Sequence, residues 1–411
     1  MISSEQMPGR RPARWMRLLL LAGSLLALIA CGSSESTSAP GGPGPQTVNQ
    51  PTAVVTSARF TSAQGGNWHG CMLGTDNQTW CWGSNEHGQL GAASTQRCMG
   101  GNIDCSTTPL AAAGGAAYAQ IVTGDLVTCG LTSAGAASCW GMGGHLGDGQ
   151  TTGGTSAVAV ADNHVFVSLA ASATSGVTCG IANDASVWCW GTGFGFGTKG
   201  PTASNTPLRW DAISGSVAWT RLVIGQGHAC GLDTDGHAWC VGSALYGLLG
   251  DGAGAPSATP VAVAGGHVFT DIAASIEHTC ALDSAGQAWC WGLGSGVGDG
   301  AATTTEQPTP VAVSTSQRFS HIAAGPNRSC ALTADGSAWC WGDVNIGDGQ
   351  GGARTTPVAV AGNHRFRSLA ISSEATCAVD MAGAAWCWGS NDTGALGIPL
   401  RRAWAAGARP R

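Results

Sequence analysis

Residues 259–300 read TPVAVAGGHVFTDIAASIEHTCALDSAGQAWCWGLGSGVGDG, and stretches of the same pattern recur along most of the 411-residue chain. Short runs of the kind that form β-strands are divided here by Gly, Asp and Ser, which favour tight turns. Each unit contains four such runs. We therefore expect every unit to form a four-stranded sheet.

Pairs of cysteines ten positions apart mark the repeat. The first cysteines of successive pairs are 58, 50, 51, 50, 50 and 47 residues apart. A period of about 50 residues is typical of propellers and solenoids. Seven units follow from the seven pairs, which are Cys71 and Cys81, Cys129 and Cys139, Cys179 and Cys189, Cys230 and Cys240, Cys280 and Cys290, Cys330 and Cys340, and Cys377 and Cys387.

The segment from Cys330 to Cys340 indicates how the two cysteines of a pair are placed. A three-residue loop, Ala334-Asp335-Gly336, with glycine in the left-handed position is a common hairpin connection. Thr333 then faces Ser337, and the two cysteines lie opposite each other with Cβ atoms about 4.5 to 5.5 Å apart. Disulfides prefer a Cβ–Cβ distance of roughly 3.5 to 4.5 Å, and an exported, oxidising location favours their formation. We expect seven disulfides; reduced core cysteines and a metal site, which the spacing fits poorly, are the alternatives.

Tryptophan flanks the second cysteine in most units. Side chains alternate along a strand, so these indoles point away from the face that carries the cysteines. We expect them to pack between neighbouring sheets; an exposed platform for carbohydrate is the alternative. The residues are Trp80 and Trp82, Trp188 and Trp190, Trp289 and Trp291, Trp339 and Trp341, and Trp386 and Trp388, with Trp140 and Trp239 alone in their units.

The N-terminus has the layout of a bacterial signal peptide over residues 1–30. Four arginines precede the apolar run Leu18–Ala30, which is 13 residues long and too short for the roughly 20 needed to span a membrane. Leu28-Ile29-Ala30-Cys31 resembles the lipobox of bacterial lipoproteins, which implies lipidation of Cys31. Gly32 rather than Asp follows, so the resemblance implies the outer membrane of the cell envelope. An ordinary signal peptide with a chance cysteine is the alternative.

Residues 31–50 are rich in Ser, Gly and Pro and are expected to form a flexible tether. Removing residues 1–30 takes away four of 18 basic and one of 24 acidic residues, which leaves 14 against 23, a net charge of −9. Lys199 is the chain's only lysine. Nucleic-acid binders need clustered cations, so we expect no nucleic-acid partner.

The strings HTCALDSAGQAWCWGLGSGVGDG (278–300), CWGSNEHGQLG (81–91) and SCALTADGSAWCWGDVNIGDG (329–349) resemble the repeat of the regulator of chromosome condensation family. The resemblance implies an all-β fold, a seven-bladed β-propeller over residues 51–397. Propellers often complete their last blade with a strand from the other terminus. Runs of the Thr-Pro-Val-Ala-Val type follow only six hairpins, so Pro51–Val55 is expected to close the seventh blade. Residues 398–411 depart from the pattern and form a predicted irregular tail.

Residues that could carry catalysis have structural explanations. His69, His228 and His278 share one repeat position, while His164, His267 and His364 share another, so each set is spread over different blades. We expect them to be structural rather than ligands or bases. Aspartates before glycine fit turns, and the pattern lacks the oxygen ligands of a calcium loop; they are Asp148, Asp251, Asp299 and Asp348. No cofactor or metal site is expected.

The first unit carries an insert, residues 96–106, with a second cysteine pair, Cys98 and Cys105, expected to form a small disulfide-closed loop. Loops on a rigid scaffold commonly carry binding specificity. Predicted partner contacts are therefore Arg97, Met99 and Ile103 in the insert, and the aromatics Phe194, Phe196 and Tyr246 in other loops.

These observations favour a non-enzymatic, envelope-anchored module that recognises a protein or glycan through its loops. The membrane would be contacted through the lipid anchor only, and no small GTPase partner is expected for an exported chain. The alternatives are an envelope lyase or hydrolase that uses the central channel, which a cluster of histidine with carboxylates there would favour, and a structural surface protein.

Overall fold

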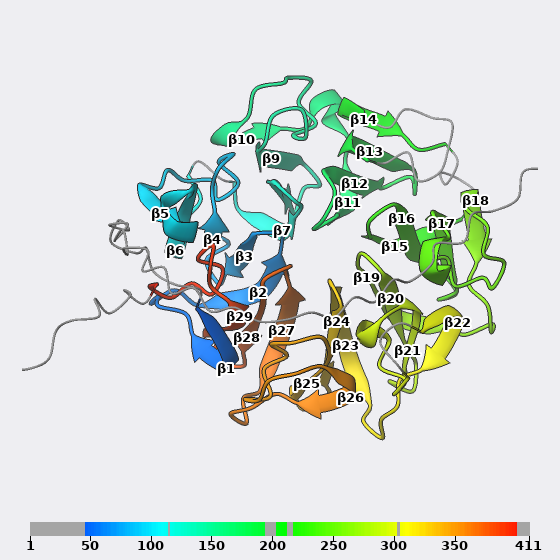
Figure 1. The fold of residues 1–411 in the computed structure, drawn as a ribbon. Helices are drawn as coiled ribbons and strands as arrows, with labels where there is room; N and C mark the ends of the chain where they lie inside the picture. The colour runs from blue at the N-terminus through cyan, green and yellow to red at the C-terminus, as the bar shows by residue number, and fades with distance from the viewer. Residues whose placement is uncertain (1–45, 114–115, 194–202, 212–216, 302–304, 401–411) are drawn as a thin grey trace, which may run out of the picture. The chain divides into compact units, whose positions relative to one another are not determined.

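Seven antiparallel sheets form a ring in the computed structural model, which describes residues 46–113, 116–193, 203–211, 217–301 and 305–400 (Figure 1). Each sheet is one blade of a β-propeller, and the first strand of each blade lines the central channel. The predicted all-β, seven-bladed fold with four-stranded blades is confirmed. No helix among the described residues is long and apolar enough to cross a membrane.

The blades follow one another along the chain. Blade one holds β2 (Phe60–Gly65), β3 (His69–Gly74), β4 (Thr79–Ser84), β6 (Ile103–Ala111) and the additional edge strand β5 (Gln96–Cys98). Blade two holds β7 (Tyr118–Thr123), β8 (Val127–Thr132), β9 (Ala137–Gly141) and β10 (Gly154–Ala159). Blade three holds β11 (Phe166–Ala171), β12 (Val177–Ala182), β13 (Val187–Thr192) and β14 (Ala203–Arg209). Blade four holds β15 (Trp219–Ile224), β16 (His228–Asp233), β17 (Ala238–Gly242) and β18 (Ser257–Ala262).

The remaining blades complete the circle. Blade five holds β19 (Phe269–Ala274), β20 (His278–Asp283), β21 (Ala288–Leu293) and β22 (Glu306–Ala312). Blade six holds β23 (Phe319–Gly325), β24 (Arg328–Thr333), β25 (Ala338–Gly342) and β26 (Arg354–Ala359). Blade seven holds β27 (Phe366–Ile371), β28 (Ala375–Asp380), β29 (Ala385–Ser390) and β1 (Thr47–Ala53). Four 3-10 turns lie between the described strands: η1 (Met99–Gly101), η2 (Ala161–Asn163), η3 (Leu245–Gly247) and η4 (Ser295–Val297).

The N-terminal strand closes the ring as predicted. β1 pairs antiparallel with β29, with Thr52 opposite Cys387, and β2 of blade one contacts β27 of blade seven. The strand begins at Thr47, inside the segment expected to be tether, because loops of blades six and seven hold this stretch. The amide of Asn391 donates to the carbonyl of Gln46 at 2.7 Å, and the amide of Gly349 donates to that of Asn49 at 2.7 Å.

Every hairpin has the register that the turn chemistry predicts, with its two cysteines directly opposite each other. In blade six, Cys330 lies opposite Cys340, and the amide of Thr333 donates to the carbonyl of Ser337 at 3.0 Å. Gly336 has a φ of +83°, the left-handed conformation that the loop requires.

Disulfide bonds are present in all seven hairpins, with Cα atoms 4.0 to 4.2 Å apart, as the register predicts. An eighth disulfide joins Cys98 to Cys105 in the insert. From blade one to blade seven, the hairpin disulfides join Cys71 to Cys81, Cys129 to Cys139, Cys179 to Cys189, Cys230 to Cys240, Cys280 to Cys290, Cys330 to Cys340 and Cys377 to Cys387.

Seven apolar clusters fill the seven interfaces between blades. In each cluster the disulfide of one blade packs against large side chains of the next, as Cys330 and Cys340 pack against Phe366 and Trp388. The last cluster joins the disulfide of blade seven to Trp82 of blade one. The interpretation of the tryptophans as core residues is confirmed for the fully buried ones, which are Trp82, Trp140, Trp190, Trp291, Trp341 and Trp388. The others are partly buried and pack against the same clusters: Trp80, Trp188, Trp239, Trp289, Trp339 and Trp386.

Blade four departs from this pattern in two compensating places. Val241 stands at the fully buried tryptophan position, and Trp219 stands where five of the other blades carry Phe and blade two carries Tyr. A smaller residue and a larger one thus fill the same interface, which keeps its total volume close to that of its neighbours.

Trp341 offers a test of this packing. Its indole is fully buried between blades five and six and donates to the carbonyl of Gly296 at 2.7 Å. Trp341→Ala is expected to lower the free energy of unfolding by about 3–5 kcal/mol. Trp339→Ala, which removes the partly buried indole two positions earlier, serves as the control and is expected to cost less. Denaturant unfolding measures both, and equal losses would contradict the interface account.

Candidate functional site

Because successive strands of a blade run antiparallel, the loops that join them lie alternately on two faces of the ring. The insert face carries the loops between the first and second strands and between the third and fourth strands of each blade. The turn face carries the tight hairpin turns, such as residues 334–336, and the connections between blades. Long loops, including residues 243–256 and 343–353, lie on the insert face, so sequence variation between blades is concentrated there.

The blade-one insert is a built structure on the insert face. β5 pairs with β6, the Cys98–Cys105 disulfide closes the loop, and Arg97 Nε lies 3.1 Å from Asp104 Oδ1. The side chain of Met99 at the tip is 47% exposed. The amide of Met99 donates to the carbonyl of Asp392 at 3.2 Å, which ties the insert to a loop of blade seven. The predicted small disulfide-closed loop is present.

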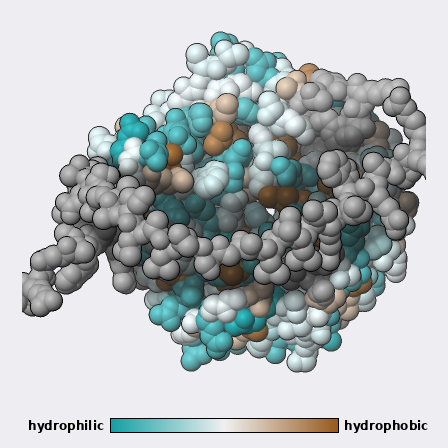
Figure 2. All heavy atoms as spheres, in the orientation of Figure 1, coloured by the Kyte–Doolittle hydropathy of each residue, from teal (hydrophilic) through white to brown (hydrophobic). Residues whose placement is uncertain are grey.

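A hollow of about 530 Å³ lies beside the insert between blades one and two. Hydrophilic residues gather over β5 and β6 in Figure 2. Glu86, His87 and Asp104 line the hollow, together with Met142 and Thr155 from blade two. A polar side chain from a partner would find hydrogen-bonding groups there.

The other predicted contacts are dispersed. Ile103 is only partly exposed within the insert. Tyr246 lies in η3 on the same face but three blades away around the ring, and its neighbour Leu245 is 60% exposed. Phe194, Phe196 and Cys31 lie outside the described residues. The structure therefore gathers Arg97, Met99 and Ile103 and does not bring Tyr246 to them.

The buried histidines join neighbouring blades. Nε2 of His69 lies 3.0 Å from Thr128 Oγ1, and Nε2 of His278 lies 2.7 Å from Ser329 Oγ; His228 makes the same contact with Thr279 at 3.0 Å. Complete burial lowers their pKa values to about 4 for His69 and His228 and to about 3 for His278, where electrostatic interaction with His228 contributes as well. They are neutral interblade links, as the structural interpretation requires.

The second histidine set also packs structurally. The rings of His164, His267 and His364 lie 3.9 Å, centroid to centroid, from those of Trp188, Trp289 and Trp386. The aspartates that precede glycine cap their own turns. Asp148 Oδ1, for example, accepts from the amide of Gln150 at 3.0 Å, and Asp251, Asp299 and Asp348 make the same contact two residues on.

A belt of polar side chains encircles the central channel. One repeat position on the first strand of each blade supplies it: Ser62, Gln120, Ser168, Arg221, Asp271, His321 and Ser368. Several members bond to the main chain of the next blade. Gln120 accepts from the amide of Leu169 and donates to its carbonyl, both at 3.0 Å, and Ser368 Oγ accepts from the amide of Ala63 at 3.0 Å.

Three consecutive belt positions are ionisable. Asp271 is bonded to Arg221 Nη2 at 2.7 Å and to His321 Nδ1 at 2.9 Å. It also accepts from the amides of Ile272 at 2.9 Å and Ile322 at 3.0 Å. Burial raises the pKa of Asp271, but the hydrogen bond from His321 and the charge of Arg221 outweigh this, and the pKa lies below its ordinary value.

Sequence reasoning missed this cluster, although it is the kind of histidine–carboxylate group that would favour an enzyme. Aligning the seven first strands would have revealed a column in which three adjacent blades carry charge. With four donors on its two oxygens, the Asp271 carboxylate has no lone-pair site left for a substrate. The cluster joins blades four, five and six in the way that Gln120 joins blades two and three.

Within the described residues, no group of three or more His, Cys, Asp and Glu side chains could hold a metal ion. The seven sheets define a β-propeller, and comparisons with known proteins agree with this fold class.

The model of the regulator of chromosome condensation (RCC1) repeat matches residues 269–296 and 319–350, which lie in blades five and six. Two of the seven blades thus match the repeat of this family. No curated protein matches it in sequence.

Solved structures share the fold at low identity. Prp20p of Saccharomyces cerevisiae, a protein that binds Gsp1p and histones, is 20% identical, with a TM-score of 0.66 over 80% of this chain and 82% of that one. Human WBSCR16 is 16% identical, with a TM-score of 0.68 over 83% and 89%. The ectodomain of the receptor kinase CR4 from Physcomitrella patens is 19% identical, with a TM-score of 0.52 over 81% and 74%.

Proposed function

We propose that this protein is a non-enzymatic binding module that recognises a protein or glycan through the insert face of its propeller. The observation that carries the proposal is the blade-one insert. A disulfide, an ion pair and a bond to blade seven hold this loop in place, Met99 at its tip is 47% exposed, and its Asp104 lines a polar hollow. Preorganised loops of this kind lower the entropy cost of binding.

The module is proposed to act outside the cytoplasm of a bacterial cell. Eight disulfides in the described residues support an oxidising, exported location. The Leu28–Cys31 motif supports a lipid anchor on Cys31, with residues 31–46 as the link to the propeller and the outer membrane as the destination. In that location the protein meets neither nucleic acid nor a cytosolic GTPase.

Removing the insert tests the proposal. The full-length protein and a variant that lacks residues 96–106 are used as bait in an envelope extract. We expect a specific partner to be recovered by the intact protein and lost with the deletion, because the deletion removes the exposed Met99 and Asp104, which lines the hollow. Melting of the deletion variant checks that the ring itself is intact.

Two single substitutions make the test quantitative. Met99→Ala is expected to lower the affinity for the partner about tenfold, which is in the range of an interface anchor. Met381→Ala removes a methionine of similar exposure, 49%, from a hairpin turn on the opposite face and is expected to leave affinity unchanged. Equal binding by all variants would contradict recognition through the insert face.

A further inference from the structure

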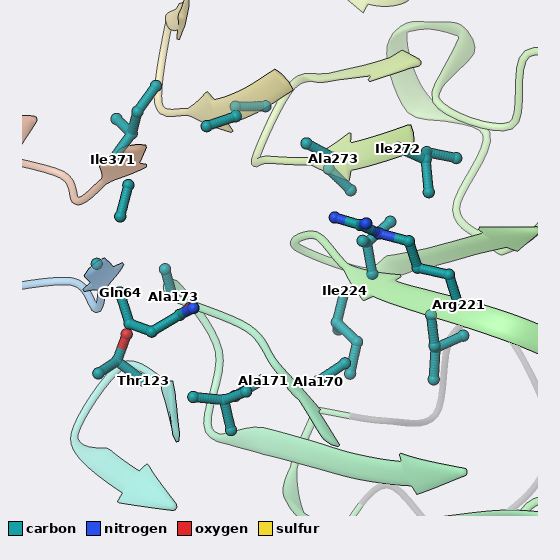
Figure 3. A pocket seen from close by; sticks show the side chains of 18 of the residues that line it. Gln64, Thr123, Ala170, Ala171, Ala173, Arg221, Ile224, Ile272, Ala273 and Ile371 are labelled. Atoms are coloured by element: carbon teal, nitrogen blue, oxygen red, sulfur yellow. The ribbon is translucent and has the colours of Figure 1, made fainter. Parts of the chain in front are cut away.

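The central channel contains a cavity of about 510 Å³, lined by the first strands of all seven blades. That volume is in the range of small-molecule sites. Toward the insert face most of the wall is formed by small or aliphatic side chains, including Ala170, Ala273, Ile224 and Ile371, with Gln64 and Thr123 as polar members (Figure 3). The polar belt borders the same cavity, which therefore has one apolar part and one polar part.

Charge in the cavity is concentrated at one place. Of the described residues that line it, Arg221 is the only one with a permanent charge, and His321 is the only other ionisable one. The side chain of Arg221 is 43% exposed and reaches from β15 into the cavity (Figure 3). Asp271, its partner, is 7% exposed and lies behind it, with its oxygens occupied by donors from the protein.

We propose that the channel binds a small monocarboxylate with an apolar body, whose carboxylate pairs with Arg221. The planar guanidinium has five N–H donors, and one nitrogen, Nη2, faces Asp271. The donors on its exposed part match the two oxygens of a carboxylate. His321 borders the same cavity with 34% of its side chain exposed and can donate to the ligand when protonated.

The cavity wall favours an apolar body for the part of the ligand beyond its carboxylate. Alanine, valine and isoleucine side chains line the other end of the cavity, so an apolar chain gains by leaving water there. A dianion such as phosphate fits less well, because Asp271 already balances most of the charge of Arg221. The amide of Gln64 projects from β2 across the cavity and can orient a polar substituent (Figure 3).

This site is separate from the one proposed on the insert face. The channel lies on the axis of the ring, whereas the insert and its hollow lie between blades one and two at the periphery. Loss of one activity leaves the other testable, because no described residue lines both cavities.

Calorimetric titration of the full-length protein with sodium hexanoate tests the site. We expect saturable binding of one hexanoate per chain. Acetate, which lacks the apolar body, and hexan-1-ol, which lacks the charge, are expected to bind at least tenfold more weakly, and inorganic phosphate likewise. Hexanoate that does not bind, or phosphate that binds as tightly, would overturn the proposal.

Variants assign the binding to Arg221. Arg221→Gln is expected to lower the affinity for hexanoate at least tenfold. Arg318 is exposed and lies outside the cavity, so Arg318→Gln is expected to leave the affinity unchanged. Should Arg221→Gln fail to fold, Ala274→Phe fills the cavity without touching the Arg221–Asp271 pair and is expected to abolish binding. Hexanoate affinity that is unchanged in Ala274→Phe would place the ligand elsewhere and overturn the assignment.

Discussion

Reduction of the seven hairpin disulfides is expected to unfold the propeller. Each bridge closes a loop of about ten residues, and loss of such a constraint costs roughly 3 kcal/mol. A domain is stable by only about 5–15 kcal/mol, so seven losses exceed the whole. The bridges also lie inside the interfaces, since both cysteines of every hairpin belong to an apolar cluster between blades.

Burial determines how the experiment must be done. The bridged cysteines Cys280 and Cys290 are 0% exposed, so a reductant reaches them only when a blade opens. We expect slow reduction in buffer and fast reduction in denaturant, followed by alkylation and mass spectrometry, and loss of near-UV circular dichroism as thiols appear.

Two double variants separate the hairpin bridges from the insert bridge. Cys280→Ser with Cys290→Ser is expected to lower stability by roughly 3 kcal/mol, while Cys98→Ser with Cys105→Ser leaves the ring intact because that bridge lies outside the interfaces. A fully reduced protein that keeps its near-UV spectrum and melting temperature would contradict the stapled-blade account.

Acid is expected to destabilise the propeller between about pH 6.5 and pH 4. His69, His228 and His278 are buried as neutral rings, and their pKa values lie at about 4, 4 and 3 in the fold against 6.5 in a solvated chain. The unfolded chain therefore binds more protons in this window, and stability is complete above pH 6.5 and falls as the pH drops. Each histidine contributes a slope of about 1.4 kcal/mol per pH unit.

Melting temperature against pH measures this effect. Replacing the three histidines by glutamine is expected to flatten the profile between pH 6.5 and pH 4, and His87→Gln, at an exposed position, leaves the slope unchanged. Burial raises the pKa of Glu374, so this carboxyl favours the folded state as the pH falls, which opposes the effect of the histidines. It is a single group, whereas three histidines act in the other direction. A wild-type profile that is flat over this range would contradict neutral burial of the histidines.

Local chemistry explains how much of the fold could be predicted. A glycine such as Gly336 fixes the hairpin loop, the loop fixes the register, and the register places Cys330 opposite Cys340. A ring must also close without an open edge, so the missing strand of blade seven had to come from the N-terminus. The hairpin register depends on residues close together in sequence, and the closing strand follows from counting the strands. Both can therefore be predicted from a single sequence.

Contacts between blades could not be predicted in the same way. The partner of His278 is Ser329, which lies 51 positions later and is identifiable only when the blades are placed side by side. The Arg221–Asp271–His321 cluster depends on three strands from three blades, each of which carries one ordinary polar residue. Likewise, the bond from Met99 to Asp392 joins the first blade to the last and forms only in the closed ring, and the hollow beside the insert needs blades one and two side by side.

Site-specific photo-cross-linking in intact cells tests the central claim, recognition through the insert face, most directly. A photoreactive residue replaces Met99 on the insert in one strain and Met381 on the turn face in another; these two methionines are 47% and 49% exposed. Recognition by the insert face predicts a discrete cross-linked partner from position 99 and none from position 381. The same adduct from position 381, with none from position 99, would contradict it.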